Sequence, residues 1–354
     1  MKIIVLTFFM CISLISKAQN IPLYVGTYTD ETSEGIYCYD FNTETGDINN
    51  QKLAAKIANP SFLSYSANRN FLYAVSEVAD FENTNSGFVS AFSVTENHTL
   101  QFINSVSSNG AHPCHIQLNE DNAAISNYTG GTISIHKVEK NGEINPAYQI
   151  INHNTPNKKS HAHSTQFFNN ELFVADLGRD FLAHYIKNGD DYVLKENYLI
   201  GEKSGPRHFK ISKSGDFMYV INELNSTITT FKKETKNYIQ IQNISTLAEG
   251  FKGESFCADI NFSHNERFLY GSNRGENSIV VFKRDENNGT LQKIQTISVN
   301  GNWPRNFTLA PNGKFLLVAN QRSKNISVYK VDKTTGILAF SNSVVVPTPV
   351  CLLF

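Results

Sequence analysis

Six side chains in the middle and C-terminal parts of the sequence have the chemistry of a site that binds an anion and moves a proton. They are His163, Arg207, His208, Glu223, Arg274 and Arg305. A guanidinium group binds a carboxylate or a phosphate through two parallel hydrogen bonds. An imidazole can accept or donate a proton near neutral pH. The set can act together only if the fold brings these distant parts of the chain to one place.

A repeated strand pattern predicts a fold that does this. An apolar strand that ends in a small polar residue occurs seven times, beginning at Leu23, Leu72, Ala123, Leu172, Met218, Leu269 and Leu316. Successive copies begin 46 to 51 residues apart. A period of about 40–50 residues built from short strands is typical of a propeller with one four-stranded sheet per repeat. We therefore expect an all-β fold, a seven-bladed β-propeller with four-stranded antiparallel blades.

The two ends of the chain carry complementary parts of one blade. Every repeated strand except the first follows another apolar strand. The seven copies of this preceding strand begin at residues 60, 113, 162, 206, 257, 304 and 349. The last copy, Pro349–Phe354, ends the chain, whereas the first repeated strand, Leu23–Thr27, has no such strand before it. We expect these two segments to pair and to close the ring, because closure removes an open sheet edge.

The propeller topology then predicts which side chains meet. The preceding strand is the innermost strand of its blade, and its start lies at the same end of the tunnel as the end of the repeated strand. We predict catalytic roles for His163, Arg207, Glu223 and Arg274 at this mouth. We predict substrate-binding roles for His208, Arg305, Asp259, Asn222, Asn273 and Tyr128. A concave mouth with several convergent polar groups is a typical small-molecule site.

Each of these residues also has an ordinary structural explanation. Polar residues at strand ends satisfy backbone groups and water, and Arg207 and Glu223 could form a salt bridge without catalytic meaning. His115 and His161 are expected to be structural. Asp176, Asp259 and the asparagines at the strand ends could hold Ca²⁺ through oxygen ligands. The sequence contains no cluster with metal-ligand spacing, and it predicts neither a metal nor a cofactor.

Composition fits one exported globular domain. Lys2, the apolar run Ile3–Ile15 and the small-residue site Ser16–Ala18 predict a signal peptide over residues 1–18. The run is too short to span a bilayer comfortably, so we expect residues 19–354 to form one propeller domain in the periplasm. Removing Lys2 and Lys17 leaves 29 basic and 32 acidic residues, a net charge of −3. No basic stretch suggests a nucleic-acid partner, and nothing predicts the oligomeric state.

Four cysteines remain after the predicted cleavage, namely Cys38, Cys114, Cys257 and Cys351. Each lies in or beside an apolar strand of a different repeat. We expect buried free thiols, because no C-x-x-C spacing points to redox chemistry or zinc.

Several of these segments together resemble the seven-bladed lactonase family, which includes the propeller-type 6-phosphogluconolactonases and the fungal carboxy-muconate lactonizing enzymes. The resemblance covers the chain after the signal and is carried by Leu23–Thr29, His161–Ser164, Gly205–His208, Asn222–Ser226, Ala258–Ile260, Phe268–Arg274 and Pro304–Arg305. It implies functional roles for His163, Arg207, Glu223 and Arg274. One position departs from the family, since many members have histidine where this chain has Asn261.

The resemblance implies hydrolysis of a sugar lactone without a metal. His163 or Glu223 would take a proton from the attacking water, Arg207 would stabilise the oxyanion, and Arg274 and Arg305 would hold an anionic arm. Export argues for an aldonolactone or uronolactone that is not a phosphorylated cytoplasmic metabolite. A lactonizing cycloisomerase of the muconate type and a non-catalytic propeller that binds an anionic ligand or a protein are the alternatives.

Overall fold

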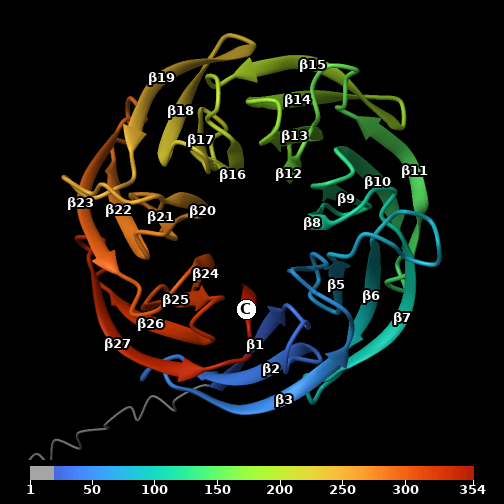
Figure 1. Cartoon of the computed structure of the whole chain (residues 1–354), viewed down its shortest axis with the longest axis horizontal. Coiled ribbons are helices and arrows are strands. Elements are labelled where there is room, and N and C mark those ends of the chain that lie inside the picture. The colour runs from blue at the N-terminus through green and yellow to red at the C-terminus, as the bar shows by residue number, and fades with distance from the viewer. Residues whose placement is uncertain (1–19) are drawn as a thin grey trace, which may run out of the picture.

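A computed structural model describes residues 20–354, which form 28 β-strands and no helix. The strands make seven four-stranded sheets arranged around one axis (Figure 1). The predicted signal peptide, residues 1–18, lies outside the described residues. Within residues 20–354, no helix is long and apolar enough to cross a bilayer.

Each sheet is one blade, and its innermost strand stands first in the following description. The first three blades are β28 (Pro349–Leu353), β1 (Asn20–Thr27), β2 (Gly35–Asn42) and β3 (Ile48–Lys56); β4 (Phe62–Tyr65), β5 (Phe71–Ser76), β6 (Phe88–Val94) and β7 (Leu100–Ser107); and β8 (Pro113–Leu118), β9 (Asn122–Asn127), β10 (Thr132–Val138) and β11 (Ile144–Asn152). The fourth and fifth are β12 (Ala162–Phe168), β13 (Glu171–Asp176), β14 (Phe181–Asn188) and β15 (Asp191–Leu199); and β16 (Pro206–Ile211), β17 (Phe217–Asn222), β18 (Thr227–Glu234) and β19 (Asn237–Ser245). The last two are β20 (Phe256–Phe262), β21 (Phe268–Arg274), β22 (Ser278–Arg284) and β23 (Leu291–Ser298); and β24 (Pro304–Leu309), β25 (Phe315–Asn320), β26 (Asn325–Val331) and β27 (Leu338–Val345).

The ring closes through its two ends. Strand β28 pairs antiparallel with β1, with Tyr24 opposite Leu353 and Gly26 opposite Cys351. Figure 1 shows the C-terminus beside β1 at the centre of the molecule. The predicted pairing of the first and last strands is therefore confirmed, together with the seven four-stranded antiparallel blades.

The core lies between neighbouring blades, because the alternating side chains of each strand pack against the next sheet. Buried tyrosines also form hydrogen bonds between neighbouring blades, and these bonds recur around the ring. The hydroxyls of Tyr73, Tyr219 and Tyr270 donate to the carbonyls of Gly142, Gly289 and Gly336, which lie in the outer hairpin turns of the following blades. The four cysteines are buried free thiols, as predicted.

Candidate active site

A repeated β-bulge at the start of the innermost strands builds the mouth of the tunnel. The pairing with the next strand skips Cys114 in β8, His163 in β12, Arg207 in β16 and Arg305 in β24. A bulged residue is left without a ladder partner, and its side chain is turned to a new direction. The bulge therefore aims chemically useful side chains at the axis from four of the seven blades.

The backbone before the bulge is also unusual. In five blades a proline stands at or just before the start of the innermost strand, and the residue before this proline has positive φ: Asn59 (43°), His112 (54°), Gly205 (63°), Trp303 (67°) and Thr348 (37°). A residue other than glycine pays roughly 1–2 kcal/mol for this conformation. Such strain is typical of positions that a functional arrangement fixes.

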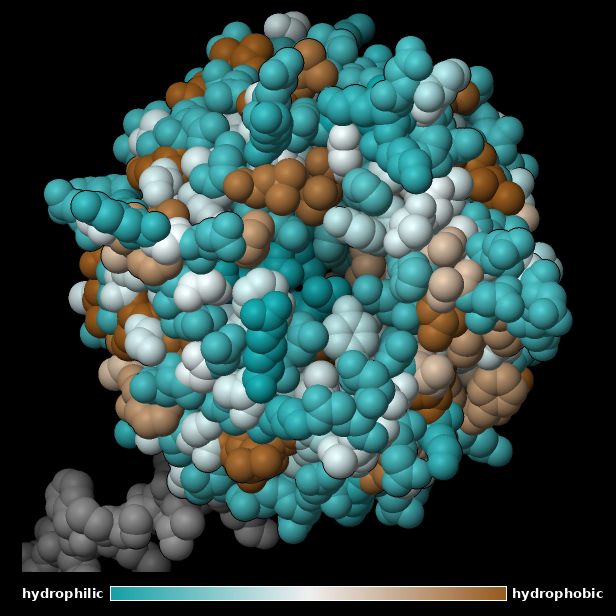
Figure 2. Space-filling view, viewed as in Figure 1, coloured by the Kyte–Doolittle hydropathy of each residue, from teal (hydrophilic) through white to brown (hydrophobic). Residues whose placement is uncertain are grey.

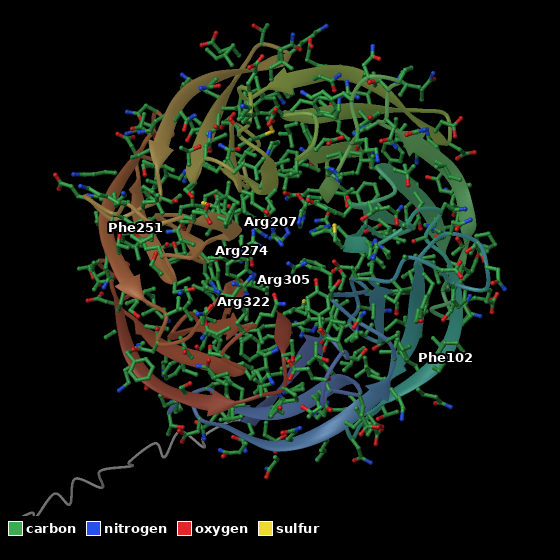
Figure 3. The ribbon with its side chains drawn as sticks, in the orientation of Figure 1. Phe102, Arg207, Phe251, Arg274, Arg305 and Arg322 are labelled. Atoms are coloured by element: carbon green, nitrogen blue, oxygen red, sulfur yellow. The ribbon has the colours of Figure 1, made fainter. Side chains whose placement is uncertain are left out.

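The mouth contains a cavity of about 220 Å³. Its lining side chains come from all seven blades: Tyr28, Glu77, Cys114, Tyr128, His163, Glu223, Arg274 and Arg305. The space-filling view shows a central hollow surrounded mainly by hydrophilic residues (Figure 2). Arg207, Arg274 and Arg305 all lie around the axis (Figure 3). The structure thus brings His163, Glu223, Arg274, Arg305 and Tyr128 together as predicted from the blade alignment.

Glu223 is held by two guanidinium groups. Its Oε2 lies 3.0 Å from Nε of Arg207 and 2.6 Å from Nη2 of Arg274. The N–H of Arg207 Nε does not point at the oxygen, so this contact is an ion pair rather than a hydrogen bond. Burial raises the pKa of Glu223, but Arg274 and Arg207 outweigh burial and hold the pKa below its usual range. Oε1 has no partner among the described residues and is free to meet a ligand.

A second, looser ion pair forms the opposite wall. Nη2 of Arg305 lies 3.5 Å from Oε2 of Glu77, which also accepts a hydrogen bond of 2.9 Å from the hydroxyl of Tyr28. The Arg305 guanidinium lies 5.3 Å from the centre of the Tyr28 ring. Arg274, Arg305, Glu77 and Glu223 line the pocket, and the guanidinium of Arg207 lies just behind its wall. Three guanidiniums against two carboxylates leave one positive charge for an anionic ligand to neutralise.

His163 has a buried imidazole at the wall of the pocket. Its side chain is buried, 4% exposed, with the ring centroid 5.6 Å from that of Tyr128. Burial and then the neighbouring Arg207 lower the pKa of this imidazole well below its ordinary value. Its Nδ1 contacts only the thiol of Cys114, at 3.8 Å, and Nε2 has no partner among the described residues. A neutral imidazole with a free nitrogen can accept a proton.

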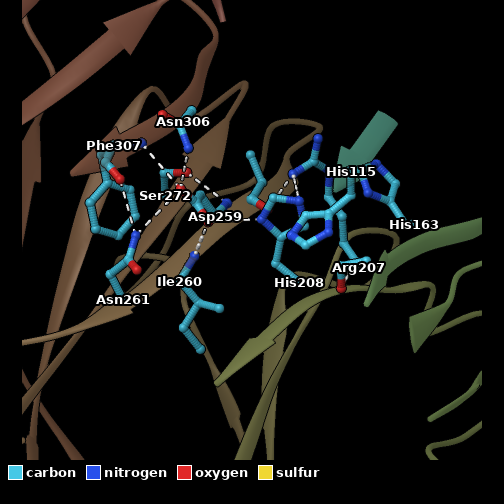
Figure 4. Close-up of polar contacts among 12 residues, drawn as sticks. His115, His163, Arg207, His208, Asp259, Ile260, Asn261, Ser272, Asn306 and Phe307 are labelled. Carbon is cyan, nitrogen blue, oxygen red and sulfur yellow. Dashed lines mark hydrogen bonds and ion pairs between the residues drawn. The ribbon is translucent and has the colours of Figure 1, made fainter. Parts of the chain in front are cut away.

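Arg207 does not line the pocket. It connects Glu223, which does, with a polar network deeper in the tunnel. Its Nη1 donates to the carbonyl of Ala258 at 2.5 Å and to Nε2 of His208 at 3.3 Å. Nδ1 of His208 lies 2.8 Å from Oδ1 of Asp259 (Figure 4). Burial and Arg207 lower the pKa of His208 to about 4, so the ring is neutral and accepts from Arg207. The chain of contacts runs from Glu223 through Arg207 and His208 to Asp259.

Comparison with known proteins places this arrangement in a family. Residues 22–354 match the family model described as a seven-bladed β-propeller lactonase. The chain belongs to the seven-bladed lactonase family. It is 32% identical over 347 residues to a 6-phosphogluconolactonase of Bacillus subtilis, an alignment covering 94% of this chain and 97% of the relative. It is 34% identical over 336 residues to a 6-phosphogluconolactonase of Formosa agariphila, covering 89% and 94%.

A solved structure agrees with the family assignment. The periplasmic gluconolactonase of Pseudomonas aeruginosa superposes with a TM-score of 0.88 at 28% identity, covering 95% of this chain and 99% of that one. The fold, its blade count and the order of the strands are therefore those of a propeller lactonase.

Besides Arg207, four predicted site residues of this lactonase lie outside the mouth pocket. Asn222 and Asn273 are fully buried within their own blades, where their Nδ2 groups donate to the hydroxyls of Thr227 and Thr229 and of Ser278, respectively. His208 and Asp259 line a second cavity deeper in the tunnel. Asn261, where the family often has histidine, lies in that deeper cavity too.

The cation site considered for the two aspartates is not assembled by the described residues. Asp176 is enclosed in its blade, where it accepts from Ser160 at 2.6 Å and contacts Nδ1 of His153 at 2.8 Å. Asp259 is bound within the tunnel network. In residues 20–354 no group of three or more His, Cys, Asp or Glu side chains is arranged to hold a metal ion.

Three lining residues were not predicted as site residues, namely Tyr28, Glu77 and Cys114. Their positions in the repeat are equivalent to those of predicted site residues, and this equivalence could have identified them. Tyr28 and Glu77 occupy the position directly after the repeated strand, which Glu223 and Arg274 occupy in their blades. Cys114 has the same place in β8 as His163 in β12. His161, which is not a predicted site residue, packs on Tyr128 with ring centroids 4.6 Å apart.

Proposed function

We propose that this propeller lactonase hydrolyses a sugar lactone in the mouth pocket. The observation that carries the proposal is the neutral, unpartnered nitrogen of His163 facing the guanidinium groups of Arg274 and Arg305 across one small cavity. Lactone hydrolysis needs a base to activate water and a positive group where the carbonyl oxygen becomes negative. The names of the two bacterial relatives and of the solved gluconolactonase support the same chemistry.

His163 is the better base of the two candidates. The two ion pairs that hold Glu223 make its carboxylate a weaker proton acceptor, because they stabilise the charged form. Nε2 of His163 would take a proton from water as the water oxygen bonds to the lactone carbonyl carbon. When the ring C–O bond breaks, the same imidazolium returns the proton to the departing oxygen, and the product is a hydroxy acid. Glu223 Oε1 would accept a hydrogen bond from a substrate hydroxyl.

Arg305 is the best placed group for the developing oxyanion. Arg207 was the sequence-based choice, but it lies behind the pocket wall and its Nη1 is bound to a backbone carbonyl. Arg274 is tied to Glu223 at 2.6 Å and to the carbonyl of Cys257 at 2.9 Å. Arg305 has the 3.5 Å ion pair with Glu77 and a contact with the ring of Tyr28, but no hydrogen bond from its guanidinium to another described residue. Of the three guanidinium groups, that of Arg305 would therefore lose the fewest contacts on turning to a ligand.

The charge of the pocket favours a substrate with an anionic arm. Three guanidiniums against two carboxylates leave one positive charge, and guanidinium groups bind phosphate or carboxylate well. Export to the periplasm, predicted from residues 1–18, would make a uronolactone or an aldonolactone the available substrate. A lactone with a carboxylate or phosphate arm satisfies the electrostatics of the pocket in either compartment.

The test is acid release from matched lactones by the purified protein. Glucono-δ-lactone, its 6-phosphate and a uronolactone would be compared in a pH-stat, with spontaneous hydrolysis subtracted. We expect enzymatic turnover and a lower KM for the anionic lactones. His163→Asn and Glu223→Gln should each lower kcat/KM by at least 100-fold, about 2.7 kcal/mol of transition-state stabilisation. The exposed His264→Asn serves as the control. No turnover of any lactone by the folded protein would refute the proposal.

A further inference from the structure

The deeper tunnel cavity contains a second, separate set of polar groups. It has a volume of about 220 Å³, and none of its lining residues also lines the mouth pocket. Equivalent positions of six innermost strands, four residues after residues 60, 113, 162, 206, 257 and 304, supply a polar ring: Ser64, Gln117, Gln166, Lys210, Asn261 and Thr308. The side chains of Arg207 and His208 lie between the two spaces, since Arg207 contacts Glu223 on one side and His208 on the other.

Lys210 is the one member of this ring that carries a full charge, and it has no partner in the part of the chain that the structure describes. Its ammonium forms neither a hydrogen bond nor an ion pair with any of residues 20–354. The side chain is half-buried in the wall of the cavity, and this burial lowers the pKa of its ammonium, an effect that the nearby Asp259 only partly opposes. A charge removed from water is costly unless a counter-charge or hydrogen bonds replace the lost hydration.

Asp259 offsets part of the Lys210 charge, but its carboxylate oxygens are occupied by other donors. Its Oδ1 receives Nδ1–H of His208 at 2.8 Å and the backbone N–H of Ile260 at 2.9 Å. Its Oδ2 receives Nδ2–H of Asn306 at 2.7 Å and the backbone N–H of Phe307 at 3.2 Å (Figure 4). Four close donors saturate the carboxylate. The ammonium of Lys210 therefore has no hydrogen-bonded counter-ion among the described residues, and Asp259 offsets its charge only partly, through space.

Two amides complete the set of groups available to a ligand. Gln117 uses Oε1 to accept from the backbone N–H of Phe167, which leaves its Nε2 donor without a partner among the described residues. Oε1 of Gln166 is fully buried and accepts no hydrogen bond. The cavity thus offers one cation, free amide groups and the hydroxyls of Ser64 and Thr308.

We propose that this cavity binds a small oxyanion, with Lys210 as its counter-charge and the side chains of Gln117 and Thr308 as hydrogen-bond donors. The volume corresponds to about seven water molecules at about 30 Å³ each, which admits sulfate, phosphate or a short hydroxy acid. An acceptor such as Gln166 Oε1 favours an anion that also carries a hydroxyl or a proton. The site is independent of lactone hydrolysis, because no mouth residue takes part in it.

The experiment is a sulfate titration at constant ionic strength, with two readouts. Isothermal titration calorimetry detects sulfate at both spaces. The single tryptophan, Trp303, lies 5.3 Å from the guanidinium of Arg274 and reports on the mouth by its fluorescence. In the parent protein we expect two calorimetric sites. In Lys210→Met the affinity of one calorimetric site for sulfate should drop by at least 10-fold. The response of Trp303 fluorescence to sulfate should be unchanged. Arg305→Met should lose the site that Trp303 reports.

The exposed Lys283→Met removes the same charge elsewhere and should keep both sites. If Lys210→Met binds sulfate as the parent does, the proposal is wrong. Should Lys210→Met fail to fold, parent crystals soaked in sodium selenate decide the matter. An anomalous selenium peak within hydrogen-bond distance of Lys210 Nζ supports the site, and density for water alone there overturns it. The outcome is distinguishable from a failure of the proposed function, because no lactone is used.

Discussion

At the scale of single residues, His163 fixes how activity should depend on pH. Burial and Arg207 lower the pKa of this imidazole, so it stays neutral when the pH falls through 6.5 and becomes protonated only at lower pH. A protonated imidazole cannot act as a base. We therefore expect kcat/KM to stay level down through pH 6.5 and to decline only at more acidic pH.

The measurement is kcat/KM against pH with an unphosphorylated lactone, because a phosphate ester itself titrates near pH 6. The chemical hydrolysis of the lactone is subtracted at each pH. A fall in kcat/KM with its midpoint at or above pH 6.5 would contradict the assignment of His163 as a buried neutral base.

Asp259 is expected to act as a positioning residue. It accepts Nδ1–H of His208, which directs the lone pair of Nε2 toward Arg207. Asp259→Asn favours the other tautomer, whose Nε2–H would face an N–H of Arg207 and would push that guanidinium away from Glu223. We expect kcat to fall by about 10–100-fold with little change in KM, a loss of roughly 1.4–2.7 kcal/mol.

The chain contains a matched control for this change. Asp176 contacts Nδ1 of His153 at the same 2.8 Å and is also buried, but it lies away from the mouth pocket. Asp176→Asn should lower thermal stability without lowering kcat of the folded protein. A nitrogen NMR spectrum of His208 should show the tautomer change in Asp259→Asn alone. Equal kcat losses in the two variants would indicate a general stability effect instead.

At the scale of strands, the sequence was sufficient to predict the blades, but it was not sufficient to predict which way the side chains near the mouth point. The repeat period and the apolar alternation predicted the blades and the pairing of Pro349–Phe354 with the first strand, because both depend on patterns with a fixed period. A strand alternates its side chains between two faces. The bulge at Arg207 breaks this alternation, so Arg207 and His208 both reach the axis at different depths. No simple pattern in the sequence predicts the position of such a bulge.

Polar strand ends illustrate the same limit. Asn222 and Glu223 are neighbours, and both were placed at the mouth from their position. Asn222 turns into the blade and satisfies the hydroxyls of Thr227 and Thr229, whereas Glu223 faces the pocket. Only the hydrogen bonds of each particular blade decide which of two adjacent polar side chains faces a ligand.

Gly205 tests whether the unusual backbone before the bulge matters for function. Its φ is +63°, and its carbonyl accepts the backbone N–H of Glu223 at 2.7 Å. Gly205→Ala would place Cβ 2.5 Å from Cγ of Leu224, a flexible side chain that can move away. The strain of positive φ should then dominate, at about 1–2 kcal/mol. We expect lower stability together with lower kcat/KM, because the shift displaces Arg207 and Glu223.

Gly250→Ala is the matched control, since Gly250 has φ of +79° and a new Cβ there meets nothing within 4 Å. It should show a similar loss in urea denaturation and unchanged kinetics. If Gly205→Ala were as active as Gly250→Ala, the geometry before the bulge would have no part in the site.

At the scale of the whole molecule, closure decides whether seven similar sheets behave as one domain. The innermost strand of the first blade comes from the other end of the chain, and its residues Val350, Cys351 and Leu352 are buried. Without β28, the edge of β1 is open and the contacts of Leu352 with the cluster between the first and last blades are lost.

Deletion of residues 349–354 should therefore unfold the propeller rather than loosen one blade. Truncating a buried Leu costs about 2–5 kcal/mol, and the deletion removes several such side chains and the backbone pairing with β1, against a typical total stability of about 5–15 kcal/mol. We expect the near-ultraviolet circular dichroism signal to disappear at 25 °C. Deleting Phe354 alone, which lies beyond β28 and is half-buried, should lower Tm by only a few degrees. A six-residue deletion that melted near the parent Tm would show that the blades are held by their neighbours and need no closed ring, and the mouth would then be fixed by local contacts instead.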